Sequence, residues 1–157
     1  MTYFSEIVHL SDIARVHGNR CPEKKAFVFE DRVVTYKEFD INSEKVANGL
    51  VLENVNEQDH VAYMDKNSDR FYELVMGCAK SNSVIVGINW RLAPPEVAYI
   101  LNDSNAKILF VGEDFFGLIE KILKDVPSIE KVICMSGKNK DWPTYEDWRD
   151  KQSDSIC

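Results

Sequence analysis

The sequence has few cysteines, and none of them are clustered. The four cysteines of this 157-residue chain stand far apart, and no two form a Cys-x-x-Cys pair. Zinc-binding and redox dithiol motifs need two cysteines close together, so neither kind of site is predicted. A dense disulfide framework is not indicated either. Cys78 and Cys134 lie in apolar stretches, where we expect each thiol to pack as a small hydrophobic group.

Long apolar runs are also missing. No run approaches the roughly 20 apolar residues that a membrane-spanning helix requires. The N-terminal stretch 1–10 contains Glu6 and His9 and does not show a basic start followed by an apolar core, so no signal peptide is predicted. With reduced cysteines, these features predict a cytoplasmic protein without a transmembrane segment.

Positive charge is in deficit. Lys and Arg number 19 against 26 Asp and Glu, which gives a net charge of -7. A protein that binds nucleic acid through phosphates needs a clustered basic face, so nucleic acid is not an expected partner. Hydrophobic residues make up 45% of the chain, which is enough for one globular domain of ordinary size.

Glycine-rich phosphate loops are absent as well. Gly112 and Gly117 have the spacing of such a loop, but Leu118-Ile119 follows where Lys and Ser or Thr would be needed. Neither a Gly-x-Gly-x-x-Gly nor a Gly-x-Ser-x-Gly motif occurs, and the three histidines have no ligand-type neighbours. Glu113-Asp114 is the only acidic pair that suggests a pocket at a strand end. The residues alone therefore predict no catalytic residue and no metal ligand.

The chain begins with patterns for a helix, a hairpin and a second helix. Apolar residues at helical spacing predict a helix that runs through Arg20. The β-prone runs 26–29 and 33–35 flank a polar turn and predict an antiparallel hairpin. Thr35 and Glu38 have the spacing of a capping box, so the second helix should begin there.

From Asp59 the pattern alternates between strand and helix, which is typical of a parallel sheet covered by helices. Pro94-Pro95-Glu96 predicts the start of one of these helices. The fold class is therefore α/β, with a parallel sheet flanked by helices and an N-terminal β-hairpin. The predicted strands are His60 to Met64, Val84 to Ile88, Ile108 to Val111 and Val132 to Met135.

The composition changes after Met135. Residues 136–157 are polar, and their large apolar side chains are Trp142, Tyr145 and Trp148, with one short helix expected from Thr144. This pattern predicts a domain portion over residues 1–135 and a polar connector over residues 136–157.

Several segments, in their order and in their amino-acid sequence, resemble the start of AMP-forming acyl-CoA ligases. These enzymes belong to the superfamily of acyl-CoA ligases, adenylation domains and luciferases. Val34 to Phe39 is similar to the family's Thr-Tyr-x-Glu-Leu helix start, and Gln58 to Ala62 to its Gly-Asp-Arg-Val-Ala segment. The most specific block is Gly87 to Glu96 together with Val97 to Ser104, which resembles Pro-x-Asn-x-Arg-Leu-x-x-x-Glu-x-x-x-Ile-Leu-x-Asp-Ser. The resemblance covers nearly the whole chain.

The sequence departs from the family pattern at four turn positions. Asn54, Gln58 and Asn82 stand where glycine is usual, and Gly87 replaces a usual proline. Glycine is common where the backbone turns, so we expect the loops at these positions to differ in detail while the fold is kept.

The resemblance implies a two-step reaction. A carboxylic acid, for which a fatty acid is the first expectation, attacks the α-phosphate of ATP to give acyl-AMP, and the thiol of coenzyme A then displaces AMP. The resemblance implies ATP, Mg²⁺ and coenzyme A as the cofactors of a full-length enzyme. It places the ATP loop, the magnesium-holding acid and the catalytic lysine after residue 157, so the chain is expected to be an inactive, incomplete portion of the large N-terminal domain.

Arg91 is the one residue that the resemblance nominates for binding. In related ligases the arginine of the Asn-x-Arg-Leu stretch lies near the phosphates of coenzyme A. The alternative is that Arg91 tethers a loop by hydrogen bonds. Two wider alternatives also stay open: a self-sufficient flavodoxin-like binding or regulatory module without catalysis, and a homodimer.

Overall fold

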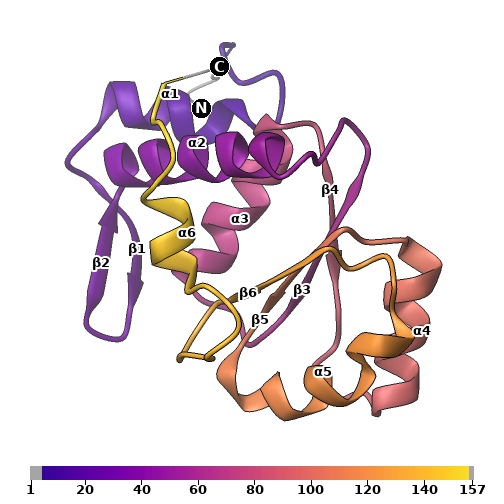
Figure 1. Ribbon diagram of the computed structural model, residues 1–157. Helices are drawn as coiled ribbons and strands as arrows, with labels where there is room; N and C mark the ends of the chain where they lie inside the picture. Colours follow the sequence, from indigo (N-terminus) through magenta and orange to yellow (C-terminus); the bar gives the residue numbers. More distant parts are fainter. Residues whose placement is uncertain (1–4, 156–157) are drawn as a thin grey trace.

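The computed structural model describes residues 5–155 as an α/β fold with two sheets (Figure 1). The larger sheet has four parallel strands in the order β4-β3-β5-β6. This confirms the predicted parallel sheet, and each strand lies within one residue of its predicted bounds. The strands are β3 (His60–Met64), β4 (Val84–Gly87), β5 (Ile108–Val111) and β6 (Lys131–Cys134).

The first part of the chain forms the predicted helix, hairpin and second helix. The elements are α1 (Asp12–Arg20), β1 (Lys25–Phe29), β2 (Arg32–Thr35) and α2 (Tyr36–Leu52). The hairpin is antiparallel and forms a separate two-stranded sheet, set apart from the four-stranded one (Figure 1). The capping box is confirmed, because Thr35 Oγ1 accepts the Glu38 N–H at 3.2 Å and Glu38 Oε2 accepts the Thr35 N–H at 2.8 Å.

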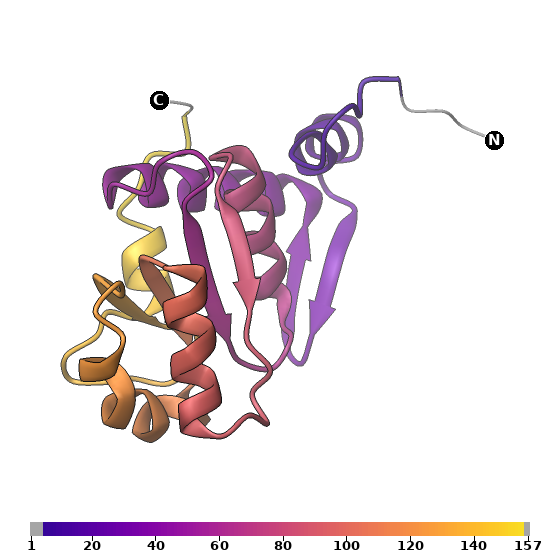
Figure 2. The same ribbon diagram turned by 90° about the vertical axis from the view of Figure 1, so that its right-hand side faces the viewer.

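Helices cover both faces of the parallel sheet (Figure 2). One face packs against α2, α3 (Asp69–Lys80) and α6 (Tyr145–Arg149), through side chains such as Tyr63 and Phe110. The other face packs against α4 (Pro94–Ser104) and α5 (Phe116–Ile122), through side chains such as Met64 and Leu109. Side chains alternate along each strand, so one strand contributes to both cores. Two short 3₁₀ turns, Glu113–Phe115 and Leu123–Asp125, flank α5.

Two helical glycines permit close contacts between elements. A Cβ at Gly77 of α3 would overlap the side chain of Val46 on α2. A Cβ at Gly49 of α2 would come within 2.6 Å of the Trp148 ring on α6. Glycine lowers helix stability by about 1 kcal/mol relative to alanine, and here it leaves the space that the neighbouring side chains fill.

Three of the four turn positions that depart from the family pattern adopt left-handed backbone conformations. Asn54, Gln58 and Asn82 have φ values of 60°, 66° and 55°. Glycine adopts this region without steric cost, and asparagine tolerates it better than most residues. Gln58 and Asn82 also bond to each other, with the Gln58 N–H donating to Asn82 O at 2.7 Å. The turns therefore keep the backbone conformation that glycine favours. Hydrogen bonds from the backbone and the side chain of Gln58 to Asn82 link two of these turns.

The segment after Met135 packs more closely than its polar composition indicated. The short helix from Thr144 is confirmed as α6, and both Tyr145 and Trp148 are buried in the core beside Phe110. The expectation that this segment is only a connector missed this packing, because two aromatic side chains bury enough area to dock a polar helix. The helix packs on the sheet face, so the character of this segment no longer argues against a self-sufficient module. The division at residue 135 stays a prediction.

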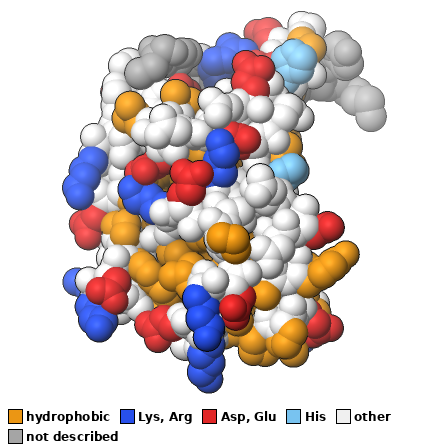
Figure 3. Space-filling view, turned by 45° about the vertical axis from the view of Figure 1, so that its right-hand side comes forward, with side chains coloured by type: hydrophobic (Ala, Val, Ile, Leu, Met, Phe, Trp, Pro, Cys, Tyr) orange, Lys and Arg blue, Asp and Glu red, His pale blue; other side chains and the backbone are white. Residues whose placement is uncertain are grey.

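Charges of both signs are interspersed on the face shown in Figure 3. Cys78 and Cys134 are buried, as expected of small hydrophobic side chains, and burial raises the pKa of the Cys78 thiol to about 12. Cys157 lies outside the described residues. No helix in residues 5–155 is long and apolar enough to cross a membrane.

Candidate functional site

The carboxyl ends of the four parallel strands meet at one edge of the sheet. Polar residues follow each strand there: Asp65-Lys66 after β3, Asn89 to Arg91 after β4, Glu113-Asp114 after β5 and Ser136 after β6. The strand order reverses between β3 and β5. In open parallel sheets ligands bind outside this edge, so a site is expected here.

A hollow of about 640 Å³ opens beside the ends of β3 and β4. Its walls include three aromatic side chains, Tyr63, Phe71 and Trp90, and two cationic ones, Lys66 and Arg91. Ligand pockets are commonly ~300–1,000 Å³ and combine apolar walls with a few polar groups. The size and lining of this hollow suit a small ligand with a flat part and negative charge.

Arg91, the nominated binding residue, lies on the exposed lip of this hollow. Its guanidinium carbon stands 4.0 Å from the centre of the Trp90 ring. Its backbone N–H donates to Asn89 Oδ1 at 3.0 Å. The loop is thus held by the backbone of Arg91 and the side chain of Asn89, while the guanidinium rests on an aromatic ring.

Lys66 approaches the same indole ring from the neighbouring strand. Its Nζ is 5.9 Å from the centre of Trp90 and 2.8 Å from Asp114 Oδ2. Trp90 also faces Phe115, with 6.2 Å between ring centres. Neither Lys66 nor Trp90 was predicted from the sequence as a binding residue. Their place in the Asn-Trp-Arg and Asp-Lys segments after consecutive strands is the signal that was available.

Asp65 also lines this hollow, and its carboxylate packs against the backbone of Gly112 after β5. A Cβ at Gly112 would overlap its carboxylate, so only glycine fits there. The carboxylate accepts the Lys66 N–H at 2.7 Å and the Ser136 hydroxyl at 3.3 Å. Burial raises the pKa of Asp65 above its ordinary value, and these two hydrogen bonds oppose that rise.

The acidic pair Glu113-Asp114 shares this edge. Glu113 packs against Gly137, whose φ of +64° and missing Cβ leave room for the carboxylate. Asp114 pairs with Lys66. Within residues 5–155 no group of three His, Cys, Asp or Glu side chains is arranged to hold a metal ion.

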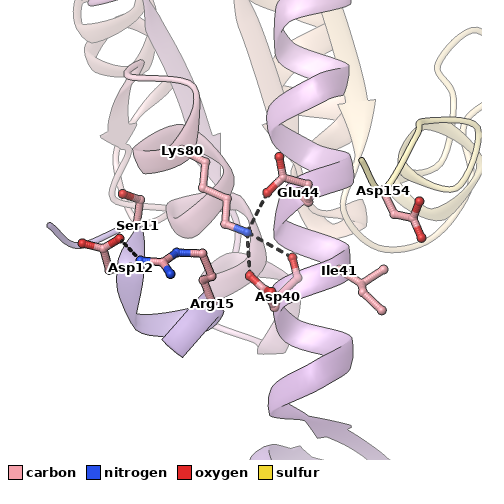
Figure 4. Close-up of a pocket in the computed structure, with 8 residues that line it drawn as sticks. All are labelled: Ser11, Asp12, Arg15, Asp40, Ile41, Glu44, Lys80 and Asp154. Atoms are coloured by element: carbon pink, nitrogen blue, oxygen red, sulfur yellow. Dashed lines mark hydrogen bonds and ion pairs between the residues drawn. The ribbon is translucent and has the colours of Figure 1, made fainter. Parts of the chain in front are cut away.

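A second hollow, of about 320 Å³, lies between α1, α2 and the end of α3 (Figure 4). Lys80 points between two side chains of α2 and lies 2.7 Å from Asp40 and 2.9 Å from Glu44. Asp12 accepts two backbone N–H groups and the Arg15 guanidinium. These charges satisfy one another, which indicates a structural role for the cluster.

A third polar cluster is centred on Glu73 of α3, whose side chain is only 2% exposed. Its carboxylate accepts Asn42 Nδ2 at 2.7 Å, the Tyr145 hydroxyl at 2.9 Å and Arg149 Nη1 at 2.8 Å. Burial raises the pKa of Glu73, against the opposing effects of Arg149 and these bonds. The cluster joins α2, α3 and α6, so it serves to hold α6 in place. The cluster was not predictable from local patterns, because Asn42, Tyr145 and Arg149 are far from Glu73 in the sequence.

Comparison with known proteins identifies the family. Residues 14–155 match the family described as AMP-binding enzyme. The chain belongs to the AMP-binding enzyme family. It is 35% identical over 126 residues to the fatty acid–[acyl-carrier-protein] ligase ScoC of Streptomyces coeruleorubidus, covering 80% of this chain and 24% of that protein. It is 26% identical over 149 residues to the indoleacetate–CoA ligase of Aromatoleum aromaticum, covering 95% and 29%.

Solved structures agree with this assignment. The anthranilate CoA ligase AuaEII in complex with anthranoyl-AMP superposes with a TM-score of 0.88 at 26% identity, over 98% of this chain and 29% of that one. The N-terminal domain of FACL13 from Mycobacterium tuberculosis gives a TM-score of 0.85 at 25% identity, over 95% and 37%. The chain therefore has the fold of part of the N-terminal domain of an adenylate-forming ligase, and it spans less than a third of the curated relatives described above.

Proposed function

We propose that this chain is the N-terminal portion of an ATP-dependent ligase that joins a carboxylic acid to the thiol of coenzyme A. The observation that carries the proposal is the family match over residues 14–155, together with relatives whose names specify acid–thiol ligation. In such a reaction a carboxylate oxygen attacks the α-phosphorus of ATP and pyrophosphate leaves. The thiol sulfur then attacks the acyl carbon, and AMP leaves as the bond to its phosphate oxygen breaks.

Residues 1–157 contribute framework and one edge of the site in this proposal. ATP carries several negative charges that need backbone N–H groups, a cation and magnesium, and the sequence has no glycine-rich loop that combines them. We place these groups in the remainder of the enzyme. Arg91, exposed on the lip of the hollow beside Trp90, contacts a phosphate of coenzyme A.

The acid itself is proposed to be a fatty acid. The 35% identical relative is a fatty acid–[acyl-carrier-protein] ligase. A further relative from Mycobacterium marinum, 20% identical, is a medium/long-chain-fatty-acid–CoA/3-oxocholest-4-en-26-oate–CoA ligase. The relatives also include ligases of indoleacetate and of 3- and 4-hydroxybenzoate, so aromatic acids are the competing class. A panel of acids in a pyrophosphate-exchange assay with the full-length enzyme separates the two classes.

A second acceptor is favoured by one observation. The 35% identical relative is a fatty acid–[acyl-carrier-protein] ligase, which makes a carrier protein the second candidate acceptor. Both acceptors present a thiol on a phosphorylated arm, so the first half-reaction is the same for either. Product analysis with each acceptor in turn decides between them.

The deciding experiment compares the 157-residue chain with the full-length protein. We expect carboxylate-dependent exchange of labelled pyrophosphate into ATP from the full-length protein and none from residues 1–157. Pyrophosphate exchange by isolated residues 1–157 would show that this segment holds a complete adenylation site. Absence of exchange by both, across fatty and aromatic acids, would favour the flavodoxin-like module without catalysis.

A further inference from the structure

Two cationic side chains flank one indole ring in the hollow beside β3 and β4. Arg91 stacks on Trp90 at 4.0 Å, and Lys66 Nζ lies 5.9 Å from the same ring centre. The two residues come from loops after different strands, so the sheet brings them together. Cation–π attraction contributes about 0.5–1 kcal/mol at exposed sites, enough to favour one position of a long side chain.

The backbone of Lys66 is held by hydrogen bonds, whereas its side chain is largely exposed. Tyr63 donates its hydroxyl to Lys66 O at 2.6 Å, and Asp65 Oδ1 accepts the Lys66 N–H at 2.7 Å. In contrast, the Lys66 and Asp114 side chains are 62% and 59% exposed. Exposed ion pairs are weak, so an incoming anion can take Lys66 from Asp114 at small cost.

The arrangement selects a class of ligand. The half-buried rings of Phe71 and Trp90 offer flat apolar surface, and two exposed cations, Lys66 and Arg91, stand at the same rim. Flat rings stack on aromatic side chains, and phosphates are met by lysine and arginine. A ligand with a planar base and phosphate groups satisfies both features, and in the proposed reaction that is the nucleotide end of coenzyme A.

We infer that Trp90 and Lys66 determine the affinity for coenzyme A together with Arg91. Trp90 is a positioning residue that holds the Arg91 guanidinium at the rim. Lys66 is a second cation that turns from Asp114 to a phosphate of the ligand. This inference rests on the proposed function. It adds Trp90 and Lys66 to the coenzyme A site, and it makes the Asp114 carboxylate a competitor for Lys66.

The test measures the two half-reactions of the full-length ligase separately. Trp90→Ala is expected to raise the KM for coenzyme A about two- to fivefold, and Trp90→Phe to restore most of the affinity. Pyrophosphate exchange should be unchanged in both variants. Tyr99→Ala is the matched control, because Tyr99 is an aromatic residue on the nearby helix α4 and is 69% exposed.

The ion pair gives a test of sign. Lys66→Met should raise the KM for coenzyme A, whereas Asp114→Asn should lower it about two- to fivefold, because Lys66 no longer has a competing partner. If the pair served only to hold the two loops, both variants would change the KM in the same direction. That result would overturn the role of Lys66.

The outcomes separate this inference from the proposed function. No pyrophosphate exchange by the wild-type full-length protein would reject the proposed function. Normal exchange with an unchanged KM for coenzyme A in Trp90→Ala and Lys66→Met would reject the inference alone. Thioester formation with a carrier protein but not with coenzyme A would also reject it, because that acceptor lacks the nucleotide.

Discussion

At the scale of single residues, glycine positions carry information that composition does not. Gly49 and Gly117 both lie within helices, yet a Cβ would strike Trp148 at the first and meets nothing within 4 Å at the second. Intrinsic helix propensity favours alanine at both positions. The contact with Trp148 joins residues about a hundred positions apart, so the sequence could not distinguish the two glycines.

These two glycines provide a matched pair of substitutions. We expect Gly49→Ala to lower the free energy of unfolding by about 1–3 kcal/mol, because the methyl group must displace the Trp148 ring. Gly117→Ala should raise it by up to about 1 kcal/mol. Urea denaturation followed by circular dichroism measures both. Equal changes in the two variants would contradict the close packing of α2 against α6.

Glu73 gives a prediction on pH. Burial raises its pKa above the ordinary value of 4.5, so the folded state holds this proton more tightly than the unfolded state. The stability that Glu73 contributes is therefore present below about pH 4.5 and is lost as the pH rises through its raised pKa. The groups facing it are Tyr145 and Arg149 of α6 and Asn42 of α2.

In Glu73→Gln this loss should disappear. The free energy of unfolding of the variant, relative to the wild type, should rise with pH in the window that begins near 4.5. Denaturation midpoints over a pH series provide the measurement, with Glu57→Gln as the exposed control. A pH-independent difference between Glu73→Gln and wild type would show that Glu73 is not the titrating group.

At the scale of elements, the parallel strands and the helix starts followed from local patterns. The capping box at Thr35 and the four strands were predictable, since both depend on residues close together in the sequence. The Asn-x-Arg-Leu stretch lies at the edge of the sheet where the parallel strands end, and the binding role of Arg91 stays a prediction. The packing of α6 was not predictable, because a five-residue helix is stable only through its tertiary contacts.

The stability of α6 depends on its two aromatic side chains. Trp148 is 4% exposed, contacts Phe110 at 5.3 Å between ring centres, and donates its Nε1–H to Glu53 at 3.2 Å. Trp148→Ala should lower the free energy of unfolding by about 3–5 kcal/mol. Tyr99→Ala, on an exposed face, should change it by less than about 0.5 kcal/mol. A small loss in Trp148→Ala would mean that α6 is not docked in solution.

At the scale of the whole molecule, the hairpin exposes apolar side chains. Val28 and Val33 are partners across β1 and β2 and are 64% and 47% exposed. Under the proposed function the rest of the enzyme covers surfaces of this kind. Residues 1–157 alone should then be marginally stable and associate with rising concentration.

Sedimentation velocity over a concentration series tests this expectation. The double variant Val28→Thr and Val33→Thr should reduce the association, because it replaces apolar surface while keeping β-branched side chains in the strands. Val51→Thr, an equally exposed valine at the end of α2, is the control for a general effect of lost apolar surface. A monomer at all concentrations with a stability of several kcal/mol would indicate a complete domain.

The attachment of the last described residues to α2 has a consequence for the order of folding. Asn48 Nδ2 donates to Ser153 O and Ser155 O, each at 2.8 Å, and Trp148 fills the notch at Gly49. These contacts close loops of about a hundred residues, and they need α2 and the face of β5 to be in place first. Docking of residues 145–155 is therefore a late event, and the same segment should be the first to open. In native-state hydrogen exchange, the free energy of opening for the amides of α6 should therefore be lower than for the amides of β3 and β5.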